Sequence, residues 1–134
     1  GAGDTPSLAI ASSDDKIFVG GQFTNTTNLG ATRLTAAGTQ DAFVAAYHAI
    51  DGSPVWDQQF GGANASSYAP SIAVAANHLT VAVSFSLAPI IVGTQTLTPA
   101  SGDIAITKLD PSTGMPVVTP SQFSIFHAKP IRCL

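Results

Sequence analysis

The sequence predicts an all-β protein built from two copies of one four-stranded unit. Three observations lead to this prediction: an unusual composition, the lack of any helical period, and an internal repeat. Charged residues make up 10% of the chain, against about 25% in an ordinary soluble domain, and all eight acidic residues are Asp. Few helix-forming residues remain, and 12 Gly and 9 Pro supply frequent turns, so the composition favours strands.

The internal repeat is the strongest of these observations. Five blocks of the first half recur in the same order in the second half, displaced by 62 to 64 residues. The matched pairs are Ser7–Ala11 with Ser71–Ala75, Ile17–Phe23 with Leu79–Phe85, 29–35 with 92–98, Asp41–Tyr47 with Asp103–Leu109, and Gly52–Val55 with Gly114–Val117. The small drifts in spacing fall in turns. The chain therefore contains two copies of a unit of roughly 60 residues.

Each copy is expected to form four strands separated by turn residues. The expected strands are Leu8–Ala11, Ile17–Phe23, Ala42–Tyr47 and Val55–Phe60, then Ile72–Ala75, Leu79–Phe85, Ile104–Leu109 and Val117–Phe123. We therefore divide the single repeat domain 1–134 into a first repeat at 7–62, a second repeat at 71–123, and a C-terminal tail at 124–134.

Two strands of the first repeat are apolar on both faces. Neither Ile17–Val19 nor Ala42–Ala46 contains a polar residue. A strand that is covered on both faces has this pattern, and in a β-propeller each four-stranded sheet lies between two neighbours. A parallel sheet with crossover helices would also give such runs, but no segment has a helical period. We expect two antiparallel β-propeller-like blades, in preference to a β-sandwich, as part of a larger or oligomeric propeller or repeat array.

The strand sequences resemble the bacterial SBBP-type β-propeller repeat over about residues 7–123. The residues that carry the resemblance are Ser7–Ala11, Lys16–Phe23, Asp41–Tyr47 and the fourth strand from Val55 to Gly62. The resemblance implies a secreted or cell-surface scaffold rather than an enzyme. The second repeat departs from the pattern, because Val118 stands where Trp56 does in the first and Gly61-Gly62 has no counterpart.

Residues 49–56 have a second, weaker similarity to quinoprotein-like propeller repeats. In such repeats a tryptophan packs against the adjacent blade, and this implies a packing role for Trp56. The ligands that a quinone site requires are not recognisable, so no cofactor is expected.

Charge and cysteine content exclude several function classes. The net charge of −3 does not suit a nucleic-acid partner, which calls for a basic face. No apolar stretch approaches the roughly 18 residues of a membrane span. The lone Cys133 cannot form an internal disulfide. Asn25 and Asn64 begin glycosylation sequons, whose use depends on the source of the chain.

Individual polar residues are best explained structurally. His48, His78 and His127 do not recur between the repeats and are expected on the surface, without a metal. Asp41 and Asp103 do recur, each before a third strand. We expect their carboxylates to accept backbone N–H bonds in a turn rather than to bind calcium, which needs six or more oxygens. No catalytic motif is present, so we do not expect an enzyme.

Two function classes remain open. The favoured one is an extracellular structural or interaction module that presents loops for protein binding or self-assembly, or that contacts neighbouring repeats of a longer chain. The segments 24–40 and 86–102 are the expected contact loops, free to vary without disturbing the core. The alternative is a lectin-like, carbohydrate-binding module in which Trp56, Tyr47 and Tyr68 would be the binding residues.

Overall fold

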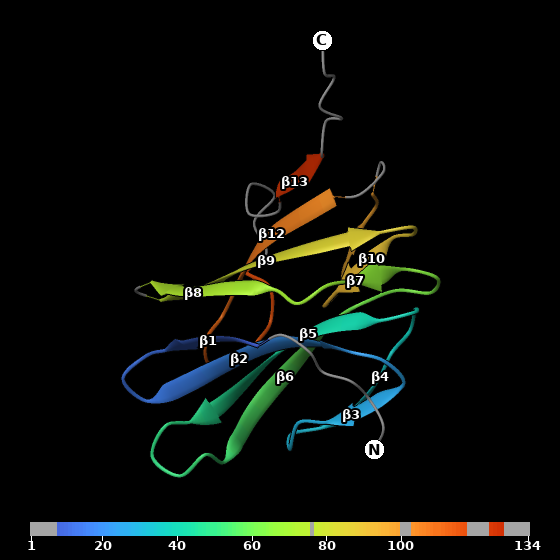
Figure 1. The fold of residues 1–134 in the computed structure, drawn as a ribbon. Helices are drawn as coiled ribbons and strands as arrows, with labels where there is room; N and C mark the ends of the chain where they lie inside the picture. The colour runs from blue at the N-terminus through green and yellow to red at the C-terminus, as the bar shows by residue number, and fades with distance from the viewer. Residues whose placement is uncertain (1–7, 76, 100–102, 118–123, 128–134) are drawn as a thin grey trace.

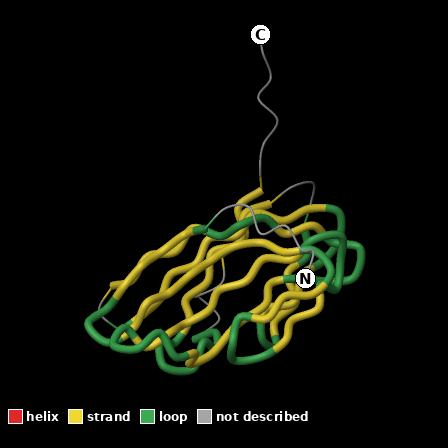
Figure 2. The backbone as a smooth tube through the Cα atoms, turned by 60° about the horizontal axis from the view of Figure 1, so that its bottom comes forward, coloured by secondary structure: helices red, strands yellow, loops and turns green. Residues whose placement is uncertain are grey.

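The computed structural model describes residues 8–75, 77–99, 103–117 and 124–127, and it is all-β over these residues (Figures 1 and 2). Its strands are β1 (Ala9–Ser12), β2 (Lys16–Phe23), β3 (Thr26–Asn28), β4 (Arg33–Thr35), β5 (Asp41–His48), β6 (Pro54–Phe60), β7 (Ser66–Ser67), β8 (Ser71–Ala75), β9 (His78–Ser86), β10 (Ile90–Val92), β11 (Gln95–Leu97), β12 (Asp103–Leu109) and β13 (Ser124–His127). No helix occurs in the described ranges, as the composition predicted.

The first repeat forms an antiparallel sheet with the strand order β1-β2-β5-β6, called here the first sheet. Consecutive strands of this repeat are therefore neighbours in the sheet, as turn-rich connections favour. The middle strand β5 is buried along Asp41–Ala46, which confirms that its apolar run is covered on both faces. The four expected strands of this repeat are correct to within one residue at each end.

The second repeat forms the second sheet, in which β8, β9, β12 and β13 follow one another in the same antiparallel order. The short strand β7 pairs with the C-terminal end of β9, whereas β8 pairs with the N-terminal part of the same strand. The first sheet therefore has four strands and the second has five, of which β7 and β13 lie outside the second repeat as bounded at 71–123. The described residues hold no closed ring of sheets, so the propeller arrangement stays a prediction.

The last strand of the second sheet lies later in the chain than the sequence predicted. It was expected at Val117–Phe123, but β13 is Ser124–His127, inside the segment expected to be a tail. Pro116 forms an isolated bridge with Leu109, flanked by hydrogen bonds from the Asp110 N–H to the Met115 carbonyl and from the Val117 N–H to the Lys108 carbonyl, each 2.9 Å long. Residues 118–123 lie outside the described part of the chain.

The two segments expected as free loops are hairpins that belong to the core, so this expectation was wrong. Strands β3 and β4 pair with each other, and so do β10 and β11. Ile90, Val92 and Leu97 of the second hairpin are buried in the main cluster. Leu29 and Leu34 of the first pack on a smaller cluster around Phe43. A few apolar residues within each polar segment point inward, and burying them favours a packed hairpin over a solvated loop.

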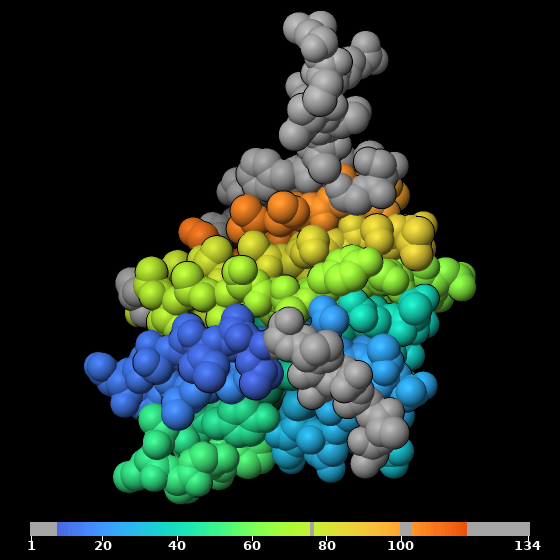
Figure 3. Space-filling view, viewed as in Figure 1, coloured from blue at the N-terminus to red at the C-terminus, as the bar shows by residue number. Residues whose placement is uncertain are grey.

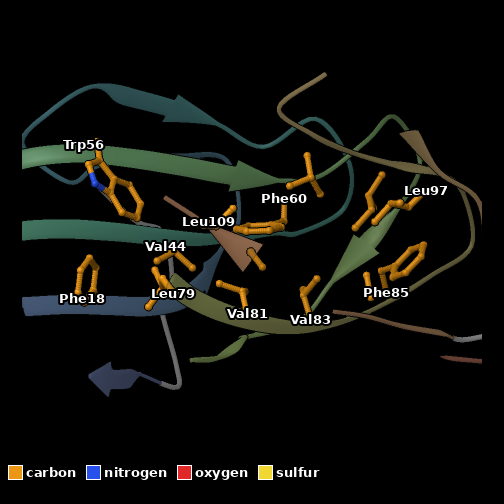
Figure 4. Packing of buried hydrophobic residues seen from close by; sticks show 14 of the residues in the cluster. Phe18, Val44, Trp56, Phe60, Leu79, Val81, Val83, Phe85, Leu97 and Leu109 are labelled. Carbon is orange, nitrogen blue, oxygen red and sulfur yellow. The ribbon is translucent and has the colours of Figure 1, made fainter. Parts of the chain in front are cut away.

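The two sheets stack face to face, and their shared interface is the main hydrophobic core (Figures 1 and 4). The labelled side chains in Figure 4 come from both layers, with Phe18, Val44, Trp56 and Phe60 on one side and Leu79, Val81, Val83, Phe85, Leu97 and Leu109 on the other. The edge strands β1 and β8 also touch, and in the space-filling view the blue first strand lies beside the yellow-green β8 (Figure 3).

Candidate interaction surface

Equivalent residues of the two repeats point in the same direction. The interface therefore brings together one face of the first repeat and the opposite face of the second repeat. Ala42 of the first sheet is fully buried against the second sheet. Its equivalent in the second repeat, Ile104, lies on the far side of the second sheet and is 46% exposed. Ala105 and Leu109 point inward there instead. This stacking leaves an outer face on each sheet, and the two outer faces are the two kinds that pack together in the middle. The β3–β4 hairpin covers the outer face of the first sheet over Phe23, Phe43 and Ala45, so the open part of this face lies along β1 and β2.

The open face of the first sheet exposes large apolar side chains that the second repeat covers. Leu8 and Ile10 are 63% and 69% exposed. Their equivalents, Ile72 and Val74, are partly buried and pack against the main core. The sequence difference is small, since all four are branched aliphatic residues. The difference in burial follows from position: the second repeat has a neighbouring sheet on this face, and the first does not.

The open face of the second sheet is more polar. Thr80 and Lys108 occupy the positions that Phe18 and Ala46 occupy at the interface of the first sheet. Ser84 on the same face is exposed as well. Exposed Ile104 pairs across the strands with the polar Ser84, whereas Ile10 pairs with the apolar Val19. Burying the open face of the first sheet is therefore more favourable than burying the open face of the second sheet.

Trp56 forms the contact between the sheets at one end of the interface. It is 7% exposed, its ring centre lies 6.0 Å from that of Phe18, and its indole Nε1 donates a hydrogen bond to the Pro111 carbonyl at 2.9 Å. The ring covers Gly114, where a Cβ atom would collide with it. This placement is the inter-sheet packing that the sequence predicted for Trp56.

The three aromatic residues proposed as a sugar platform are not brought together. Trp56 lies on the inner face of the first sheet, and Tyr47 lies on its outer face, where the phenol donates to the Leu29 carbonyl at 2.7 Å. Partial burial, helped by the charge of Asp57, raises the pKa of Tyr47. Tyr68 follows β7 and is exposed.

Asp41 organises the turn before β5, as the sequence predicted. Its buried carboxylate accepts the backbone N–H of Ala37 at 2.8 Å and that of Gly38 at 3.3 Å. The amide of Gln59 also donates to it, at 2.5 Å. Sequence reasoning missed this last partner, because it lies on another strand. Asp103 is buried at the equivalent position of the second sheet.

The histidines lie apart. His48 is exposed at the end of β5, and His78 is half-buried at the start of β9. For His127 only the backbone, in β13, is described. Within the described ranges, no group of three or more His, Cys, Asp or Glu residues could hold a metal ion. Those ranges also contain no helix that is long and apolar enough to cross a membrane.

A polar cleft of about 340 Å³ opens between the turn ends of the two sheets. Asp15 and Asp110 line it, and both carboxylates already have partners: the Lys16 ammonium lies 2.5 Å from Asp15, and the Ser112 hydroxyl and backbone N–H donate to Asp110. These bonds, led by those from Lys16 and from the Ser112 hydroxyl, lower the pKa of both carboxyl groups. Each carboxylate therefore serves its own turn, and the two do not converge on one point.

Comparison with known proteins gives no relative from which a function could be carried over. No protein-family model, no curated protein and no solved structure matches the chain.

Proposed function

We propose that this chain is a non-catalytic structural module that binds other protein units through the open apolar face of its first sheet. The units are copies of itself or neighbouring repeats of a longer chain. The proposal keeps the extracellular or cell-surface location that the resemblance to SBBP-type repeats implies.

The observation that carries the proposal is the difference in burial between equivalent residues. Ile72 and Val74 are packed at an inter-sheet contact, while Leu8 and Ile10 are open to water in the same geometry. Burying apolar surface contributes about 25 cal/mol for each Å². Two branched side chains beside the half-buried Ile17 and Val19 therefore favour association. This face bears strand side chains rather than the loops expected from the sequence.

Light scattering on the isolated chain tests the proposal. At micromolar concentration we expect a mass above the 13.6 kDa of the monomer, rising with concentration. The matched variant carries Leu8→Asn and Ile10→Asn, which add amide groups to the exposed face and leave the inter-sheet core intact. We expect this variant to be monomeric with an unchanged circular dichroism spectrum. A variant that associates as well as the native chain would refute the proposal, and a native chain that stays monomeric would exclude copies of itself as the bound units.

The same samples test the lectin-like alternative. A glycan-array signal that persists in the Leu8→Asn, Ile10→Asn variant would place binding elsewhere on the molecule. The exposed Tyr68 would then be the first residue to substitute.

A further inference from the structure

We propose that the natural occupant of the first sheet's open face is another repeat whose fourth strand carries a tryptophan, as Trp56 does, followed by Gly-Gly. This inference depends on the proposed function and names the partner for the same surface. The occupant would sit on the first repeat as the first repeat sits on the second, with its tryptophan over Gly52.

The turn that receives the indole of Trp56 at Gly114, called here its seat, occurs a second time in the chain, at Gly52. Gly52 and Gly114 both have φ of +72°, and each donates its N–H over 2.8 Å to the carbonyl four residues earlier, on His48 and Asp110. The indole of Trp56 covers Gly114, whereas nothing lies within 4 Å of a Cβ built on Gly52. The first repeat thus has the same turn with the same backbone shape, and its seat is open.

The turn around Gly52 presents one large exposed apolar side chain beside the polar residues Asp51 and Ser53. Ile50, in the turn that contains Gly52, is 94% exposed. Its equivalent is Ser112, next to the Pro111 carbonyl that accepts the Trp56 hydrogen bond. Leu8 and Ile10 lie on the open face of the same sheet. Ile50 therefore gives the empty seat an exposed apolar side chain where the occupied seat has Ser112, while Ser53 stands where the occupied seat has Met115.

The Gly61-Gly62 pair lets the end of β6 lie directly against the hairpin of the second repeat. The hairpin of the second repeat reaches the end of β6, where the Ile91 N–H donates to the Gly61 carbonyl at 2.8 Å. Gly62 lies so close to the Pro89 backbone that a Cβ atom would collide with it. In the first repeat, Asn28 stands at the position of Ile91 and is exposed. An occupant whose fourth strand ended in Gly-Gly could approach the β3–β4 hairpin as closely as Gly61 and Gly62 approach the β10–β11 hairpin.

The second repeat of another copy of this chain fits the seat less well. Its open face has Thr80 and Lys108 where the occupied interface has Phe18 and Ala46. Position 118, equivalent to Trp56, is Val in the sequence and lies outside the described residues. The face that fits the open face of the first sheet is one with the residues of the first repeat's inner face, such as Phe18, Ala46 and Trp56. The occupant is therefore a further repeat of the first type, placed ahead of residue 7.

The test extends the full chain at its N-terminus with a second copy of residues 7–70. Docking predicts one cooperative urea transition at a higher midpoint than that of the native chain. It also predicts that both indoles resist acrylamide quenching. Gly52→Asn supplies the matched variant, because Asn tolerates positive φ but adds a side chain beneath the new indole. We expect it to lower the midpoint of the extended chain and to leave the native chain nearly unchanged.

Two results would overturn the inference. The first is that acrylamide quenches the added tryptophan as it quenches a solvated indole. An unfolded added copy counts as this result, because the same sequence folds against the second repeat and should fold against the first if it docks there. The second is an equal effect of Gly52→Asn in both chains. Light scattering on the native chain distinguishes the two proposals. Association of the native chain without docking of the added copy contradicts only the identity of the occupant, whereas a monomeric native chain together with an undocked added copy contradicts the proposed function.

Discussion

Replacing Trp56 with alanine should destabilise the protein by about 3–5 kcal/mol, the usual cost of truncating a buried large aromatic residue. The structure gives reasons for this magnitude. The indole is almost fully buried between the sheets, contacts Phe18, and covers Gly114. Its Nε1 is the donor to the Pro111 carbonyl, and a hydrogen bond of this kind contributes about 0.5–1.5 kcal/mol.

Urea denaturation followed by far-UV circular dichroism measures this effect. Fluorescence cannot serve, because Trp56 is the only tryptophan in the chain. Trp56→Phe separates the two contributions, since it retains an aromatic ring and loses the N–H donor. We expect it to cost less than Trp56→Ala and at least the roughly 1 kcal/mol of the hydrogen bond. A loss below about 1 kcal/mol for Trp56→Ala would mean that the indole is not packed between the sheets.

The two turn glycines provide an internal control. Gly52→Ala and Gly114→Ala impose the same backbone strain, about 1–2 kcal/mol for a side chain in the left-handed region, because both residues have φ of +72°. Only the Gly114 substitution also drives a Cβ atom into the Trp56 ring. Gly114→Ala should therefore be the more destabilising of the two, and Trp56→Ala should remove most of the difference. Equal losses would contradict the contact.

Three further predictions concern other parts of the fold. Asp41→Ala leaves the Ala37 and Gly38 N–H groups without their acceptor, so it should cost about 1–3 kcal/mol in urea denaturation, and a neutral result would refute the turn-capping role. Leu97→Ala should cost about 2–5 kcal/mol by the same assay, because this hairpin residue is part of the core; a loss typical of a solvated loop would contradict that assignment. The pKa of Asp110 is lowered below the usual 3.8 in the folded state, so its contribution to stability is present above 3.8 and is lost as pH falls through the folded value. Asp110→Asn should therefore lose less stability than the native chain between neutral and acidic pH, and parallel curves would show that the carboxylate does not contribute.

The four strands of the first sheet and three of the second, β8, β9 and β12, could be predicted because the repeat displays the same pattern twice. Apolar runs such as Ala42–Ala46 identified strands covered on both faces. The role of Asp41 followed from its recurrence before each third strand. The position of β13 could not be predicted in this way, because the second repeat loses the tryptophan and Gly-Gly that mark the end of β6 in the first.

Long-range contacts account for the remaining differences. The Trp56 acceptor lies 55 residues away in sequence, and Gln59 reaches Asp41 from a neighbouring strand. The first hairpin resembles a solvated loop because only Leu29 and Leu34 in it are large and aliphatic, and their inward orientation depends on the sheet beneath. The open face could not be recognised either: Leu8 and Ile10 match Ile72 and Val74 in type, and only the three-dimensional stacking shows which pair is covered.

Solvent paramagnetic relaxation of methyl groups measures the central claim most directly, because it reports the exposure of each side chain in solution. In dilute protein, a soluble gadolinium complex should relax the Leu8 and Ile10 methyl groups strongly and those of Ile72 and Val74 weakly. As concentration rises, the first pair should become as protected as the second, while exposed Ile104 changes less. Protection of Ile104 without protection of Leu8 and Ile10, or no change at any of these residues, would contradict the account.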